Sequence, residues 1–74
     1  MSKSLLRRKV RHRVVVSLKS GDSFQGVLSG VYAEAMELRC AQLIDGRGEL
    51  MPVDGHLLVL RADVAYIQIP EPTN

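Results

Sequence analysis

Three glycines, Gly21, Gly26 and Gly30, stand close together in the stretch SGDSFQGVLSGV, residues 20–31. A similar spacing occurs in loops that hold nucleotide phosphates, where the full pattern is GxxxxGK[ST] between a strand and a helix. Here two apolar residues follow Gly26, so the lysine for the phosphates and the hydroxyl for magnesium are both missing. A strand pattern follows instead of a helix. We therefore interpret the glycines as serving backbone geometry and not a nucleotide.

The remaining reactive side chains form no recognisable catalytic or metal-binding pattern. No serine lies in a GxSxG elbow. One cysteine and two histidines, without CxxC or HxxxH spacing, are too few for a structural zinc site. We expect His12 to pack beneath a helix or at a strand end, Cys40 to be a buried small residue of a strand, and His56 to lie in a turn. The sequence predicts no enzyme, no cofactor and no metal.

The charge of the chain is divided unevenly. The net charge is +2, yet residues 1–21 carry seven cations and no acid, whereas residues 22–74 carry three cations and eight acids. A basic end on a mildly acidic body is typical of proteins that bind polyanions. Several phosphates could be contacted by Arg7, Arg8, Lys9, Arg11 and Arg13, of which Arg7, Arg8 and Arg11 are the candidate RNA-binding residues of this arm. The alternative is a basic terminus that is only solvated.

Hydrophobic periodicity predicts a mainly β chain behind a short helix. A helical turn or two is expected over residues 4–9, and strands over residues 10–18, 24–31, 36–44, 56–63 and 64–69. KSGD at residues 19–22 and DGRGE at residues 45–49 are turn signals, and residues 50–55 fit either strand or loop. We expect a single domain over residues 1–70 and a disordered tail over residues 71–74.

Five short strands in about 60 residues suit a small, strongly bent antiparallel barrel of the SH3-like or OB-like kind. Gly26 and Gly30 would mark a bend or a close approach of another backbone. A chain of 74 residues with one cysteine has a small core and no internal disulfide. The last two strands are apolar, so their edges are expected to pair with other copies in a closed homo-oligomeric ring. No membrane span or secretory signal is expected, and the unpaired cysteine fits the cytoplasm.

These patterns resemble the Sm and Sm-like family over about residues 4–69. VVVSLKSGDSFQGVLSGV, residues 14–31, is similar to the first half of the Sm1 motif, and LRADVAYI, residues 60–67, is similar to the Sm2 motif. The resemblance implies an N-terminal helix and a five-stranded bent barrel. It also implies rings of five to seven subunits, closed between the fourth and fifth strands of neighbours, with single-stranded RNA, often uridine-rich, at the central pore.

The resemblance implies a site but also shows departures from it. Arg61 matches the Sm2 arginine, and Met36 matches the Sm1 methionine with one extra loop residue. Tyr32 stands in place of the usual aspartate and is the candidate for base stacking. Glu37 replaces the base-reading asparagine, where its carboxylate would accept from a uracil N3–H but repel phosphate. Two further departures, in the stacking position and in the Sm2 glycine, are the alanines Ala35 and Ala62.

Three functional hypotheses follow. The first is a non-enzymatic RNA-binding ring of a divergent bacterial or phage type. The second is a structural or assembly ring, for example of a phage, that uses the fold without specific nucleic-acid binding. The third is a module that coats or regulates DNA through the basic arm.

Overall fold

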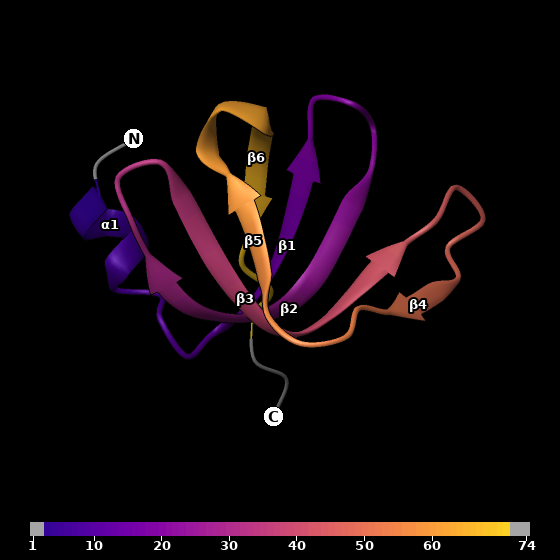
Figure 1. The fold of residues 1–74 in the computed structure, drawn as a ribbon, viewed down its shortest axis with the longest axis horizontal. Coiled ribbons are helices and arrows are strands. Elements are labelled where there is room, and N and C mark those ends of the chain that lie inside the picture. Colours follow the sequence, from indigo (N-terminus) through magenta and orange to yellow (C-terminus); the bar gives the residue numbers. More distant parts are fainter. Residues whose placement is uncertain (1–2, 72–74) are drawn as a thin grey trace.

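A computed structural model describes residues 3–71 of the chain. A short helix α1 (Lys3–Arg7) leads through turns into one bent antiparallel sheet of six strands (Figure 1). The strands are β1 (Arg13–Leu18), β2 (Ser23–Val31), β3 (Ala35–Ile44), β4 (Leu50–Pro52), β5 (Leu57–Leu60) and β6 (Val64–Gln68), and a 3₁₀ turn η1 (Arg61–Asp63) joins the last two. The predicted mainly β fold with an N-terminal helix is confirmed.

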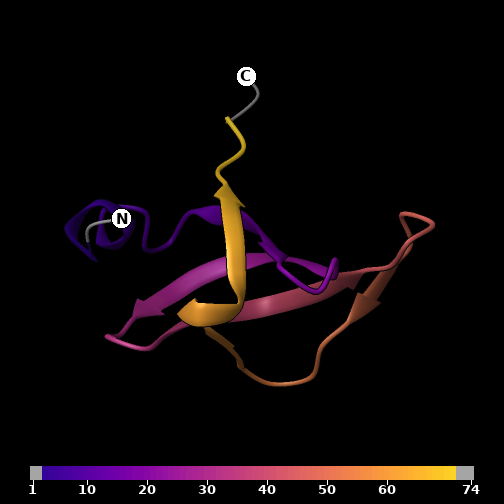
Figure 2. The same ribbon diagram turned by 90° about the horizontal axis from the view of Figure 1, so that it is seen from above.

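The sheet runs in the order β4-β3-β2-β1-β6, and β5 pairs with the other end of β3. The long strands β2 and β3 curve strongly, which carries β4 and β5 to different places along β3 (Figures 1 and 2). Among the described residues β5 and β6 do not pair with each other. The barrel is therefore open, with free strand edges along β4, β5 and β6.

The strand count differs from the predicted five. The region left open between strand and loop, residues 50–55, begins with the short strand β4, which pairs with Gln42–Ile44. Pro52 ends it, and Gly55 takes a positive φ of 72° before β5 begins. Because proline and a left-handed glycine interrupt a strand ladder, β4 and β5 are two separate short strands.

The core lies on the concave side of the sheet and under α1. Apart from Leu6 of α1, its buried side chains alternate along the strands with a period of two, which the register shifts between β2 and β3 interrupt after Leu28 and after Leu38. The core residues are Leu6, Val14, Val16, Leu28, Val31, Met36, Leu38, Ala41 and Val59. Leu6 anchors the short helix, which would not be stable alone. In residues 3–71 no helix is long and apolar enough to cross a membrane.

Gly26 lies where the backbones of β2 and β3 come closest. A Cβ atom at this position would stand 3.0 Å from the Arg39 carbonyl oxygen and 3.1 Å from the Ala41 Cα. The close approach predicted for this glycine is thus confirmed. Gly30 is crowded differently, since a Cβ there would stand 2.8 Å from the Tyr32 hydroxyl oxygen.

Two expectations for single residues in this part of the chain are wrong. Cys40 is exposed and takes a left-handed φ of 52°. It sits in a β-bulge, because β3 has one residue more than β2 between the pairs Gln25–Gln42 and Val27–Arg39. His12 is also exposed, in the turn before β1, so it does not pack beneath the helix. The expected tail lies mostly in residues 72–74, outside the described part.

The β-bulge at Cys40 predicts which of two substitutions at this residue gives the more stable protein. The left-handed region costs a residue with a Cβ about 1–2 kcal/mol, and β-branched residues suffer most. Cys40→Gly is therefore expected to be more stable than Cys40→Val by about 1–2 kcal/mol in urea denaturation. In a regular strand position valine would be the more stable of the two. A valine variant that equals or exceeds the glycine variant would contradict the bulge.

Candidate nucleic-acid interface

The loop between β2 and β3 and the turn η1 lie side by side at one end of the sheet (Figure 1). The loop is closed by the Tyr32 N–H donating to the Ala35 carbonyl at 2.8 Å. The Arg61 N–H donates to the Glu34 carbonyl at 2.9 Å, and its guanidinium makes a longer contact of 3.5 Å to the Tyr32 carbonyl. Arg61 therefore joins the two segments, although it is 29 residues away from Tyr32 in the sequence.

Tyr32 is the exposed aromatic residue of this loop, with 53% of its surface accessible. Its ring lies over Gly30, the position where any side chain would collide with it. Because residue 30 is glycine and has no side chain, the Tyr32 ring can pack against the backbone of β2. The outer face of the tyrosine stays open for stacking with a planar group.

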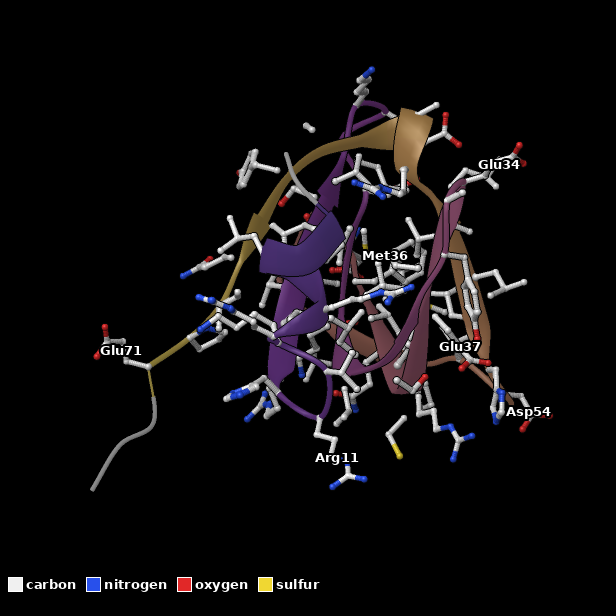
Figure 3. The ribbon with its side chains drawn as sticks, turned by 90° about the vertical axis from the view of Figure 1, so that its left-hand side faces the viewer. Arg11, Glu34, Met36, Glu37, Asp54 and Glu71 are labelled. Atoms are coloured by element: carbon white, nitrogen blue, oxygen red, sulfur yellow. The ribbon has the colours of Figure 1, made fainter. Side chains whose placement is uncertain are left out.

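Met36 and Glu37 follow the loop on β3 and point to opposite faces (Figure 3). Met36 is only 1% exposed and belongs to the core. Its side chain therefore has almost no surface on which RNA could bind. Glu37 points outward, toward the segment before β5 that contains Asp54 (Figure 3).

The Glu37 carboxylate is held by two partners from other elements. One oxygen accepts from the Ser29 hydroxyl at 2.9 Å, and the other lies 2.8 Å from the His56 Nδ1. The hydrogen bond from Ser29, followed by the bond and charge of His56, lowers the pKa of Glu37. The side chain is 17% exposed. Glu37 is therefore a fixed carboxylate that has one partner on each oxygen and keeps a further lone pair on each.

Glu37 should contribute to stability in a pH-dependent way. A carboxylate whose pKa is lowered on folding stabilises the folded state fully above its ordinary pKa of 4.5, and this contribution is lost as the pH falls through the lowered value. Glu37→Gln should remove the dependence. The stability difference between wild type and variant should thus shrink between pH 6 and pH 3 in urea melts. If the stabilities of wild type and Glu37→Gln changed in parallel with pH, this role of Glu37 would be contradicted. Glu49→Gln, at the exposed β3–β4 hairpin, is the matched control.

Two shallow grooves flank the loop. One, with a volume of about 530 Å³, is lined by Tyr32, Ala33, Glu34, Ala35, Glu37 and Leu58. The other, of about 380 Å³, is lined by Ala33, Glu34, Leu60, Arg61 and Ala62. Together they offer an aromatic ring, apolar walls, the fixed Glu37 carboxylate, the exposed Glu34 carboxylate and one guanidinium. Such a set suits a planar base with hydrogen-bond donors better than it suits an isolated phosphate.

The arginines of the basic arm are separate from this loop. Arg7, Arg8 and Arg11 are all exposed. Arg11 takes a left-handed φ of 80°, and its N–H donates to the Leu28 carbonyl at 2.7 Å. It lies at the opposite end of the molecule from Glu34 (Figure 3). The predicted site residues thus fall into two groups: the loop site, made of Tyr32, Met36, Glu37 and Arg61, and the basic arm.

Sequence reasoning missed two members of the loop site, Ser29 and His56. His56 lies 19 residues from Glu37 and comes from a segment that the sequence describes only as a turn. To find the contact of His56 with Glu37 one would have to know that β3 pairs with β5, which places Glu37 opposite Leu58. Within the described residues no group of three or more His, Cys, Asp or Glu side chains is placed to hold a metal.

Comparison with known proteins decides the fold. Neither a protein-family model nor a curated protein sequence matches the chain. Among solved structures, a heptameric archaeal Sm protein matches with a TM-score of 0.81 and 20% identity, over 92% of this chain and 98% of the other. The chain has an Sm-like fold.

Other archaeal Sm structures agree. The Pyrobaculum aerophilum SmAP1 heptamer matches with a TM-score of 0.84 and 20% identity, over 93% of this chain and 92% of the other. A Pyrococcus abyssii Sm protein, solved in complex with a uridine heptamer, matches with a TM-score of 0.81 and 26% identity, over 90% and 94%. In the Sm-like fold of this chain, the loop after β2 and the turn before β6 are the segments that the motif resemblance singled out.

Proposed function

We propose that this protein is a non-enzymatic, RNA-binding Sm-like protein that acts in the cytoplasm as a homo-oligomeric ring. The observation that carries the proposal is Arg61, which is bound to the Tyr32–Ala35 loop by backbone and side chain. This contact gathers a cation and an exposed aromatic ring at one end of an open barrel. A similar Sm structure was solved with a uridine heptamer, which supports the same ligand class here.

Two free strand edges, those of β5 and β6, support the proposed ring. Unpaired strand edges form ladders with other chains unless they are covered or charged. The outward side chains of β5, Leu58 and Leu60, are 62% and 55% exposed, and Tyr66 on β6 is 63% exposed. Pairing of β5 with β6 of the next copy is head to tail, so it closes into a ring, for which we propose five to seven subunits.

A second feature of the free edges supports the ring. A groove of about 460 Å³ opens beside β6, and its walls include Leu6 of α1, the core residue Met36 and the β6 residues Tyr66 and Ile67. Apolar walls that reach the core are costly to leave in water. Contact with a neighbouring copy would cover them.

Each loop residue has a role in the proposed RNA site. Tyr32 stacks on a base, Arg61 binds phosphate or a base edge, and Glu37 accepts from a base while Met36 supports the loop. Arg7, Arg8 and Arg11 add sequence-independent phosphate contacts, which would also allow DNA to bind. Repetition around a ring multiplies weak individual contacts.

Arg61 provides the direct test of the RNA site. A hydrogen bond from a charged group is worth about 1.5–3 kcal/mol, so Arg61→Gln should weaken binding of a uridine oligonucleotide by about 10- to 150-fold in fluorescence anisotropy. Arg47→Gln removes the same charge from the exposed β3–β4 hairpin and should leave affinity nearly unchanged. Equal affinities of the two variants would remove Arg61 from the site.

The second candidate is a structural or assembly ring without specific nucleic-acid binding. It is favoured by the carboxylates of the groove, because Glu34 is exposed there and Glu37 is already bonded on both oxygens. Mobility shifts with oligo-U, oligo-A and single-stranded DNA across a salt series distinguish the candidates. No binding at about 50 mM salt would favour the structural ring, since phosphate-driven affinity is greatest at low salt. Equal binding of RNA and DNA would favour a DNA-coating role.

A further inference from the structure

The outer face of the sheet carries two arginines in one row across three strands. Arg13 of β1 is opposite Val27 of β2, and Val27 is opposite Arg39 of β3. Residues directly opposite each other in a sheet project from the same face. Both arginines are exposed, whereas Val27 between them is half-buried. Neighbouring strands lie about 4.8 Å apart, so the two arginine Cα atoms stand about 10 Å apart.

Neither arginine of the row is in a direct ion pair. In residues 3–71 the single ion pair joins Glu37 to His56. Glu37 lies two residues from Arg39 on the same face of β3, and the charge of Arg39 helps to lower the pKa of Glu37, whose oxygens are bonded by Ser29 and His56. The row on the other side is neutral, because the Gln25 amide donates to Gln42 at 2.7 Å. The two arginines therefore form a positive row with a neutral neighbour on one side and the bonded Glu37 carboxylate on the other.

The backbone around the row fixes its position. The bulge at Cys40 inserts one exposed residue directly after Arg39, and β3 then returns to the core with Ala41. On the other side, the Arg11 N–H donates to the Leu28 carbonyl at 2.7 Å and ties the end of the basic arm to β2. Arg13 follows two residues later, so the row continues from the arm onto the sheet.

We propose that Arg13 and Arg39 form a second phosphate-binding surface, which holds the backbone of single-stranded RNA away from the loop site. The proposal rests on the RNA-binding function proposed above. Guanidinium groups bind phosphate oxygens through two parallel hydrogen bonds, and two of them across a strand suit successive phosphates of an extended chain. Val27 and the glutamine pair leave that chain a path without negative charge on the side of the row away from Glu37. The surface would bind without regard to base identity.

The salt dependence of RNA binding tests this surface. Each phosphate contact with a single strand adds about 0.7 to the slope of log affinity against log salt. We expect Arg13→Gln/Arg39→Gln to lower the slope by about 1.4, measured by anisotropy with a mixed-sequence RNA of about 20 nucleotides between about 50 and 200 mM KCl. Arg13→Lys/Arg39→Lys keeps the charges and should restore most of the slope. Arg47→Gln, at the hairpin, should keep the wild-type slope.

The outcomes separate this inference from the proposed function. If the wild type binds RNA and the double glutamine variant keeps the wild-type slope, the second surface is wrong and the loop site stands. If the lysine variant loses as much slope as the glutamine variant, a structural effect of the substitutions explains the loss and the surface is again wrong. If the wild type binds no RNA at the lowest salt concentration, both proposals fail.

Discussion

Gly26→Val is expected to destabilise the fold strongly. A Cβ at residue 26 would stand 3.0 Å from the Arg39 carbonyl oxygen and 3.1 Å from the Ala41 Cα, which are backbone atoms of the paired strand. Overpacking against groups that cannot move costs about 1–3 kcal/mol and sometimes more, and valine adds two further methyl groups. Because small domains are stable by only about 5–15 kcal/mol, with short chains at the lower end, such a loss is large.

Circular dichroism and urea denaturation measure this effect. Gly46→Val is the matched control, since a Cβ at residue 46 meets nothing within 4 Å and the φ of this glycine is not positive. The control should unfold within about 1 kcal/mol of the wild type. A Gly26→Val protein with the stability of the control would contradict the close approach of β2 and β3. A folded ring that had lost only its ligand would assign the glycine to binding instead.

Leu58→Asp/Leu60→Asp is expected to dissociate the proposed ring into 8.2 kDa monomers. Burial of each leucine is worth about 1.5–3 kcal/mol, and two charges would instead be placed in an apolar contact. The loss per interface is therefore about 3–6 kcal/mol, or at least a 100-fold rise in the dissociation constant. The monomer fold should survive, because both side chains already face outward.

Size-exclusion chromatography with light scattering reads out the change in mass. Leu50→Asp is the control, since this residue is an exposed leucine of β4, a strand that takes no part in the proposed contact between β5 and β6. It should elute with the wild type. A double variant that keeps the mass of the wild type would place the contact between copies elsewhere.

Local patterns sufficed for most of the fold. Alternating apolar residues marked β1, β2 and β3, and the turn residues between them marked the reversals, because both depend on side-chain period and local backbone preference. Glycine inside an otherwise regular strand pointed to the tight contact at Gly26. The meeting of Arg61 with the Tyr32 loop depended on the motif resemblance, since nothing local connects residues so far apart.

The errors arose where tertiary pairing overrode local pattern. Cys40 looked like a buried strand residue, but the bulge that bends β3 places it outside. His56 looked like a simple turn residue, but the pairing of β3 with β5 brings it to Glu37. The strand expected over residues 56–63 is shorter, because β5 ends at Leu60 and the turn η1 begins at Arg61.

Native mass spectrometry of the wild-type protein with a uridine oligonucleotide at low ionic strength tests the central claim, an RNA-binding ring, most directly. We predict a complex of five to seven 8.2 kDa subunits that takes up the oligonucleotide without loss of subunits. A monomer at micromolar concentration would contradict the ring. An intact ring that takes up neither this oligonucleotide nor a mixed-sequence RNA would contradict the RNA-binding function.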